Sequence, residues 1–123
     1  MGVAGSRFDL RSLTSLHWIA ITMALVSALI HLVLGIGFLP HWMGFAFLLA
    51  SGGFIGGVVL VLLDYRRKLL YLLGIPYTAA QIVLWYALNQ PAGLGDIPES
   101  HAMDKIAQVI LILSLVVLYR RGP

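Results

Sequence analysis

Four long apolar runs, separated by short polar stretches, make up most of this chain of 123 residues. The runs cover about residues 16–37, 42–63, 69–89 and 102–119, close to the roughly 20 residues that cross a bilayer as a helix. A helix of a soluble bundle carries a polar stripe at helical spacing, whereas these runs are apolar on all sides. The pattern predicts an all-α fold of four transmembrane helices in a single integral membrane domain, residues 1–123.

The connections between the runs are short, with one exception. A tight basic turn spans residues 64–68, and the longer loop at 90–100 holds two prolines and two glycines. Short connections make consecutive helices antiparallel neighbours. The fourth run is the shortest, at the lower limit for crossing, and Ser100 or His101 is the expected cap of its helix. We therefore expect an antiparallel four-helix bundle.

Seven of the eight basic residues fall on one side of this topology. They precede the first run, lie between the second and third runs and follow the fourth: Arg7, Arg11, Arg66, Arg67, Lys68, Arg120 and Arg121. The positive-inside rule assigns that side to the cytoplasm. The sequence therefore predicts a multi-pass protein of the cell membrane with both termini in the cytoplasm. The basic charge is a topology signal and forms no groove for a polynucleotide, so nucleic acid is not an expected partner.

Composition supports a membrane protein and excludes several kinds of chemistry. The chain is 60% hydrophobic and 11% charged, against about 25% charged in an ordinary soluble domain, so the lipid bilayer is its expected surrounding. It has no cysteine, which excludes disulfides, iron–sulfur clusters and thiolate metal sites. No nucleophile–base pair, phosphate-binding loop or paired carboxylate occurs within the runs, so an enzyme acting on a soluble substrate is not expected.

The second run contains four glycines at the spacing of close helix contacts. Gly52 pairs with Gly56 and Gly53 pairs with Gly57, four residues apart in each case. A glycine removes the side chain, so a neighbouring backbone can approach closely and pack by dispersion. The four glycines therefore pack inside the bundle, form a face for self-association, or do both. We expect a homo-oligomer, a dimer or a trimer, that uses this face.

One polar side chain from each run falls at a similar depth in the membrane. These residues are His31, Ser51, Gln81 and Gln108, roughly 9–15 Å from the side that lacks the basic clusters. An unpaired polar group costs several kcal/mol in hydrocarbon, so we expect the four to face inward. They form either a structural hydrogen-bond network or, because His31 titrates, a functional site. We expect no acidic residue in the bundle interior.

His17 and His31 lie fourteen residues apart and about 40° apart around one helix. This spacing resembles that of b-type cytochromes, in which one helix carries two histidines that ligate different haems near opposite membrane faces. The resemblance implies haem b as the cofactor, with His31 and His17 as axial ligands. No second helix carries a matching pair, so the most that carries over is one haem at His31, with His41 or His101 as second ligand. Lys105, the one basic residue on that side, is the only candidate partner for the propionates.

The region around His101 offers another kind of site. The ligand types that bind zinc or copper gather there: His101, Asp104, Glu99 and, across the mouth of the bundle, His41. The alternative is a helix N-terminus on the surface, with Ser100 or His101 as the cap and Asp104 favoured by the helix dipole. The sequence favours this structural alternative.

Three segments of the chain resemble a small four-span protein family of halophilic archaea. They read HLVLGIGFLPHWMG, LLDYRRKLLYLLGIPYT and QIVLWY. The resemblance implies an archaeal source and a four-span topology, and it implies no function.

Three functional hypotheses follow. The first is a haem-binding membrane protein of cytochrome b type, in electron transfer or haem sensing, with a redox partner and with Gln81 and Gln108 beside a haem held by His31. The second is a non-catalytic accessory subunit that docks through the glycines of the second run. The third is a carrier of a small solute, a proton or an ion that uses the polar layer, in which His31 alone would relay protons.

Overall fold

The structure is a computed structural model that describes residues 10–90 and 92–121, so Arg7 lies outside the described residues. It contains four long helices and a short 3-10 helix, in the order α1 (Ser15–Phe38), α2 (Trp42–Leu62), α3 (Arg67–Asn89), η2 (Leu94–Asp96) and α4 (Glu99–Arg120). No strand occurs within these two ranges. Each long helix is long and apolar enough to cross a membrane. The predicted all-α class with four membrane-length helices is confirmed.

The fourth helix begins earlier than the sequence pattern predicts. It starts at Glu99 instead of 102, because Pro98 is its N-cap and the carbonyl of Pro98 accepts a hydrogen bond from the Ala102 N–H at 3.0 Å. A proline suits this position because it has no N–H of its own to satisfy. Helix α4 is therefore 22 residues long and α2 is 21. The prediction that the fourth helix is the shortest, with its cap at Ser100 or His101, was wrong.

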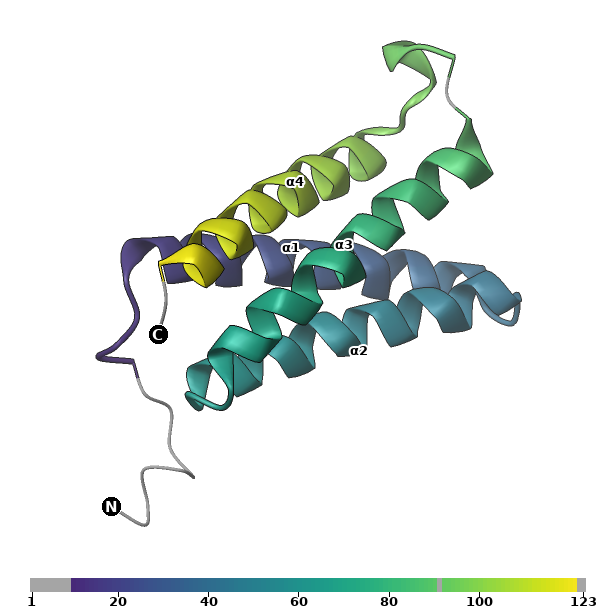
Figure 1. Cartoon of the computed structure of the whole chain (residues 1–123). Coiled ribbons are helices and arrows are strands. Elements are labelled where there is room, and N and C mark those ends of the chain that lie inside the picture. The colour runs from purple at the N-terminus through teal and green to yellow at the C-terminus, as the bar shows by residue number, and fades with distance from the viewer. Residues whose placement is uncertain (1–9, 91, 122–123) are drawn as a thin grey trace.

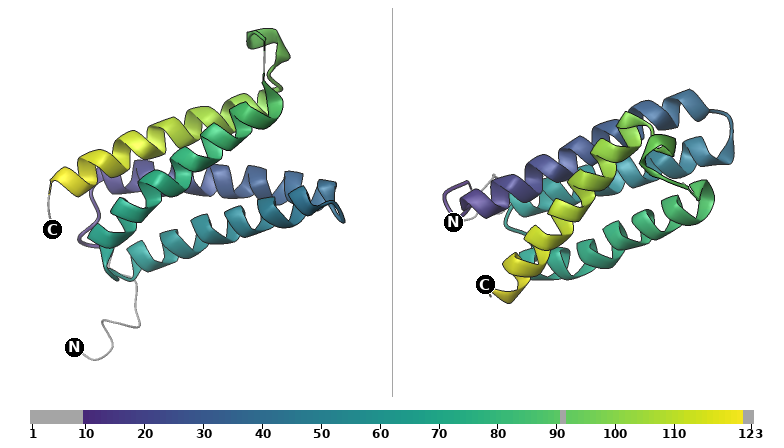
Figure 2. Two further views of the ribbon diagram at one scale, coloured as in Figure 1. Left: turned by 45° about the vertical axis from the view of Figure 1, so that its right-hand side comes forward. Right: turned by 90° about the horizontal axis from the view of Figure 1, so that it is seen from above.

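Helices α1 and α4 each pack along two neighbouring helices. Helix α1 packs along both α2 and α4, and α3 packs along α4. Helices α2 and α3 share a turn but make few further contacts, and Figure 2 shows α3 diverging from α2 along its length. The bundle is therefore open between α2 and α3.

The connections of the bundle lie at two ends. The α1–α2 and α3–α4 connections lie toward the right of Figure 1, while the α2–α3 turn, the beginning of α1 and the end of α4 lie toward the left. We call the left end the basic end, because it carries six described basic residues: Arg11, Arg66, Arg67, Lys68, Arg120 and Arg121. We call the right end the loop end.

Helices α1 and α2 approach each other most closely through two glycines. A Cβ atom added to Gly44 would lie 2.7 Å from the carbonyl oxygen of Gly35, so no larger residue fits at this contact. Farther along the same interface, the Ser51 hydroxyl donates to the Ala28 carbonyl at 2.8 Å. Small residues and hydroxyl groups of this kind hold transmembrane helices together.

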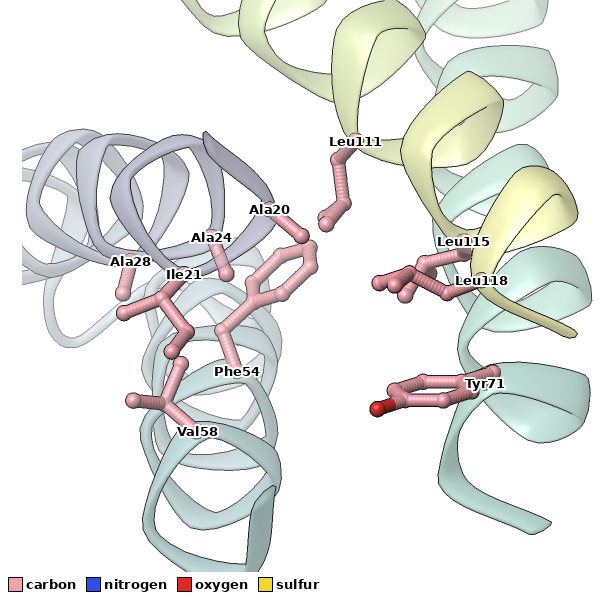
Figure 3. Packing of buried hydrophobic residues seen from close by; sticks show 10 residues of the cluster. All are labelled: Ala20, Ile21, Ala24, Ala28, Phe54, Val58, Tyr71, Leu111, Leu115 and Leu118. Atoms are coloured by element: carbon pink, nitrogen blue, oxygen red, sulfur yellow. The ribbon is translucent and has the colours of Figure 1, made fainter. Parts of the chain in front are cut away.

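The apolar core lies between the middle of the bundle and its basic end. All four helices contribute to it, as Figure 3 shows: Ala20, Ile21, Ala24, Ala28, Phe54, Val58, Tyr71, Leu111, Leu115 and Leu118. The outside of the bundle is also apolar, and Leu49, for example, is 77% exposed. Apolar side chains around the whole circumference are what a bilayer covers, so the four helices indicate a multi-pass membrane protein.

Candidate functional site

Six polar side chains from α1, α3 and α4 meet inside the bundle toward its loop end. We call them the polar cluster: Ser27, His31, Gln81, Asp104, Lys105 and Gln108. Ser27 and Gln108 are completely buried, and His31 and Asp104 are only 5% and 4% exposed. Polar groups at this depth in a membrane are stable only when they satisfy one another.

Asp104 is the unexpected member of this cluster. The expectation that no acidic residue lies in the interior, and that Asp104 sits at a surface helix terminus, was wrong. Because α4 begins at Glu99, Asp104 falls in its second turn and shares the inward face with Gln108, four residues on. Its Oδ1 accepts a hydrogen bond from the Ser27 hydroxyl at 2.5 Å, and the Lys105 Nζ lies 2.9 Å from its Oδ2.

Gln108 connects the helices of the cluster. Its Nε2 donates to Ser27 Oγ at 3.1 Å and to Gln81 Oε1 at 2.9 Å, and its Oε1 accepts from Lys105 Nζ at 2.9 Å. The Gln81 amide donates to the Tyr77 carbonyl at 3.2 Å. The predicted meeting of Gln81 and Gln108 in the interior is confirmed. Ser51, predicted in the same layer, bonds separately to the α1 backbone.

The Lys105 side chain also packs inside the bundle. Its side chain is 15% exposed, and its ammonium group lies 5.7 Å from the centre of the Trp85 ring. The resemblance to b-type cytochromes made Lys105 the candidate partner for haem propionates, whereas the structure pairs it with Asp104. Because each charge compensates the other, removal of either one leaves an uncompensated charge in the bundle, which typically costs about 3–5 kcal/mol.

The contacts of His31 assign its protons. Nδ1 lies 2.8 Å from the Ser27 carbonyl oxygen and 3.6 Å from Asp104 Oδ1. A carbonyl oxygen only accepts hydrogen bonds, so Nδ1 carries the proton and Nε2 of the neutral ring is a free acceptor. The ring packs against Phe47 and Phe54, with centroids 5.1 and 6.2 Å away. Nε2 of His31 can therefore accept a proton or bind a metal ion.

A cavity of about 390 Å³ opens beside the polar cluster at the loop end, and we call it the polar cavity. His31, Gln81, Asp104 and Lys105 are among the polar residues that line it, and apolar side chains of α1, α2 and α3 line the rest. His101 lines it too, and its Nδ1 accepts a hydrogen bond from Trp85 Nε1 at 3.1 Å. Neutral His101 therefore carries its proton on Nε2, whereas neutral His31 carries its proton on Nδ1.

The other two predicted haem ligands lie elsewhere. His17 is near the basic end, where its Nδ1 accepts a hydrogen bond from the Thr14 N–H at 3.0 Å. His41 is exposed and caps α2, accepting from the Met43 N–H at 3.1 Å. Neither residue lines the polar cavity. Of the four predicted histidines, the structure brings only His31 and His101 to the same cavity.

The alternative of a zinc or copper site at the loop end is not supported. Among residues 10–90 and 92–121, no group of three or more histidine or acidic side chains could hold a metal ion. Asp104 points to Ser27 and Lys105, and His101 bonds to Trp85. The ligands predicted for this site, Glu99 and His41 included, are therefore not assembled.

The four glycines of α2 do not form a single face. A Cβ atom on Gly53 would collide with the Tyr77 hydroxyl, which donates to the Ala50 carbonyl at 2.8 Å. Gly57 lines a second cavity, described below. Gly52 and Gly56 are exposed, and a Cβ atom on either would touch nothing. Self-association through α2 stays a prediction, and Gly52 and Gly56 are the residues open to it.

The comparisons with known proteins place the chain in a family. A model of a family of unknown function (DUF7475) matches residues 4–119, so the chain belongs to this family. No curated protein and no solved structure matches the chain. The expected membership of a family without a known function is confirmed, whereas the archaeal source and the resemblance to b-type cytochromes stay predictions.

Proposed function

We propose that this family member binds a membrane-soluble weak acid in its polar cavity and exchanges a proton with it. The observation that carries the proposal is the burial of Asp104, Lys105 and His31 together on the wall of that cavity. Ionisable side chains at membrane depth are rare and mark substrate sites and proton relays. Reversible binding of a weak acid with its proton is the step that a carrier of such acids needs.

The charges of the cluster suit this chemistry. Before binding, Lys105 and Asp104 form an ion pair, and the hydrogen bond from His31 Nδ1 to the Ser27 carbonyl leaves Nε2 as the acceptor. In the proposed exchange the O–H bond of the acid breaks, a bond from the proton to His31 Nε2 forms, and the carboxylate of the ligand stays in the cavity. Asp104 Oδ1, 3.6 Å from Nδ1, stabilises the imidazolium, and Lys105 faces the new carboxylate. The net charge of the site stays zero throughout, because each new charge lies beside an opposite one. An uncompensated charge would be costly in this low-dielectric environment.

The remainder of the cavity fits an apolar tail. The polar groups of the wall gather on α3 and α4 with His31, while Phe38, Phe47 and Leu88 are among the apolar side chains that complete the lining. The volume of about 390 Å³ lies within the roughly 300–1,000 Å³ typical of small-molecule sites. A short fatty acid has the matching division into a polar head and an apolar chain.

Binding of decanoic acid to the purified protein tests this proposal. Fluorescence of Trp42 and Trp85, which line the cavity, reports occupancy. We expect saturable binding of decanoic acid at least tenfold tighter than binding of methyl decanoate, which has no proton to give. His31→Gln abolishes this preference, whereas Ser114→Ala preserves it, because Ser114 is buried in α4 but bonds only to the Ile110 carbonyl. Equal affinity for acid and ester would falsify the proposal.

Haem b is the second candidate ligand, and the orientation of His31 favours it. Histidines that bind metals commonly donate their other N–H to a carbonyl or carboxylate, as His31 Nδ1 does. A haem there would supply one-electron redox chemistry. His101 would have to release Trp85 to ligate through Nδ1, and Lys105 is already paired with Asp104. A Soret band in the purified protein, absent after His31→Ala, would support haem, and a featureless spectrum before and after dithionite would exclude it.

The orientation and assembly of the protein complete the proposal. The gathering of basic residues at one end of the bundle supports an antiparallel four-span protein of the cell membrane with both termini in the cytoplasm. The exposed glycines Gly52 and Gly56 support a homo-oligomer, a dimer or a trimer. In this orientation the polar cavity faces the outer half of the membrane.

A further inference from the structure

A second cavity lies toward the basic end, and we call it the apolar cavity. Its volume is about 390 Å³, and all four helices line it. Its walls are almost entirely apolar and include the core residues Phe54, Val58, Leu115 and Leu118. Figure 3 shows the space between the α2 residues on one side and Tyr71 with the α4 leucines on the other.

The apolar cavity opens onto the face of the bundle between α2 and α3. These helices share a turn but make few further contacts, and the wall residues that they contribute are partly exposed. On α3, Leu73 is 55% exposed and Tyr77 is 38% exposed. On α2, Gly53 and Gly57 contribute no side chain to the wall. This face belongs to the apolar circumference that a bilayer covers, so the molecules beside the opening are lipids.

The length of the apolar cavity matches one leaflet of a bilayer. Its lining runs from Leu70 to Thr78 on α3 and from Gly53 to Val61 on α2. Each of these ranges covers about 12 Å at ~1.5 Å per residue. Half of a hydrocarbon core about 30 Å thick is about 15 Å. The cavity therefore has the length of most of one acyl chain in the leaflet next to the basic end.

Positive charge lies where the apolar cavity meets the turn between α2 and α3. Arg66 and Lys68 are exposed in this turn, and the Arg66 carbonyl accepts a hydrogen bond from the N–H of Leu70, which lines the cavity. Asp64 pairs with Arg67 at 3.3 Å and is the only acid at the basic end in the part of the chain that the structure describes. The charges of Arg66 and Lys68 are therefore complementary to an anionic headgroup.

Two tyrosines hold these cations near the membrane surface. The Arg66 guanidinium carbon lies 5.6 Å from the centre of the Tyr65 ring, and Lys68 Nζ lies 5.2 Å from the centre of the Tyr119 ring. A cation within about 6 Å of an aromatic ring is attracted by it, and tyrosine is enriched at membrane–water interfaces. Both cations therefore lie at the depth of phospholipid headgroups.

We propose that the apolar cavity binds one anionic phospholipid, whose phosphate lies beside Arg66 and Lys68 while one acyl chain occupies the space between α2 and α3. The lipid completes the packing of two helices that make few direct contacts. This site is separate from the proposed acid site, because the two cavities share no lining residue. Tyr77 lies between them, because it lines the apolar cavity and its hydroxyl bonds to Ala50, which lines the polar cavity.

Lipid retention by the full chain tests the role of the headgroup. Native mass spectrometry counts the lipids that stay bound when the protein is released from detergent micelles. The micelles contain equal amounts of palmitoyl-oleoyl phosphatidylglycerol and of the phosphatidylcholine with the same acyl chains. We expect one phosphatidylglycerol per chain, retained at least tenfold more than phosphatidylcholine. Arg66→Gln combined with Lys68→Gln abolishes this preference, whereas Arg11→Gln combined with Arg121→Gln, which removes the same charge from the same end, preserves it.

Adjacent glycines provide a matched pair of variants for the acyl chain. Gly57 lines the apolar cavity and Gly56 does not, and a Cβ atom on either would touch nothing. Gly57→Phe therefore places a ring in the cavity, whereas Gly56→Phe places one on the exposed surface of α2. We expect Gly57→Phe to lower the retention of phosphatidylglycerol at least tenfold and Gly56→Phe to leave it unchanged.

Glycerol phosphate, which carries the anionic group without acyl chains, distinguishes a lipid site from a site for a small phosphate ion. We expect a large excess of glycerol phosphate to leave the bound phosphatidylglycerol in place, and its displacement overturns the proposal. Equal retention of the two lipids, equal losses in the two charge variants or equal losses in the two glycine variants overturn it as well. A wild-type dimer that retains no lipid assigns the opening to a second copy of the chain instead.

Discussion

The two cavities have the same volume, about 390 Å³ each, and differ in almost every other respect. The polar cavity has the ion pair of Asp104 and Lys105, the two histidines His31 and His101, and Gln81 on its wall. The cavity toward the basic end has mostly apolar walls, and the buried hydroxyls of Tyr71 and Thr78 on its wall have no hydrogen-bond partner among the described residues. The four helices therefore enclose two chemically distinct cavities, one toward each end of the bundle.

The two cavities differ because the buried face of a single helix is polar along one part of its length and apolar along the other. On α4, Asp104 and Gln108 are followed on the same face by Leu111, Leu115 and Leu118. On α1 the order is reversed, since Ala20 and Ala24 precede Ser27 and His31 on the buried face. The two helices pack against each other, so polar meets polar toward the loop end and apolar meets apolar toward the basic end. The mean hydropathy of a whole helix conceals this division, because the polar and apolar parts are averaged into one hydrophobic span.

The largest expected effect breaks the charge pair of the polar half. Asp104→Ala leaves Lys105 as a buried unpaired charge and lowers the free energy of unfolding by about 3–5 kcal/mol. The measurement is reversible unfolding in mixed micelles with increasing sodium dodecyl sulfate. Glu99→Ala is the control, because Glu99 is an exposed acid of the same helix, and Asp104→Leu combined with Lys105→Met recovers most of the loss. A loss no larger in Asp104→Ala than in Glu99→Ala would contradict the buried pair.

The next largest effect is expected when a buried side chain of the apolar half is shortened. Leu111 is 4% exposed and lines the apolar cavity, so Leu111→Ala enlarges that cavity and costs about 2–4 kcal/mol in the same unfolding measurement. Leu113, two residues on, is 62% exposed, and Leu113→Ala costs less than about 1 kcal/mol because it faces lipid. Equal losses for the two variants would show that the apolar half is not packed as described.

Substitution of Gly53 tests whether Tyr77 separates the polar half of the bundle from the apolar half. A methyl group there collides with the Tyr77 hydroxyl, so Gly53→Ala displaces Tyr77 and costs about 1–3 kcal/mol. Gly52→Ala meets no atom and improves helix propensity, so it stabilises by up to about 1 kcal/mol. If both variants shift stability in the same direction, Tyr77 does not close the gap between α2 and α3.

The smallest effect compares two buried hydroxyls. Ser51 donates to the Ala28 carbonyl, so Ser51→Ala loses an interhelical hydrogen bond, worth about 0.6 kcal/mol in membranes. Thr78 makes no hydrogen bond within residues 10–90 and 92–121, so Thr78→Val costs nothing or stabilises the protein. The check is the difference between the two unfolding midpoints, and a larger loss in Thr78→Val would mean that Thr78 is hydrogen-bonded after all.

The sequence pattern predicted the four helices well because long apolar runs leave few alternatives in a bilayer. It predicted that His31, Gln81 and Gln108 face inward, because unpaired polar groups are costly there. It did not predict the place of Asp104, which depends on where α4 begins. A signal was present, since Asp104 and Gln108 repeat at the same spacing as Ser27 and His31. The divergence of α3 from α2 is a property of packing, and no local pattern encodes it.

In the proposed function, His31 Nε2 takes a proton from the ligand in the polar cavity. Nitrogen-15 NMR of histidine-labelled protein, with His31→Gln to assign the signal, tests it most directly. The account predicts a neutral His31 with its proton on Nδ1, and an Nε2 signal that becomes protonated on addition of decanoic acid but not of methyl decanoate. A His31 with its proton on Nε2, or one that decanoic acid leaves unchanged, would contradict the account.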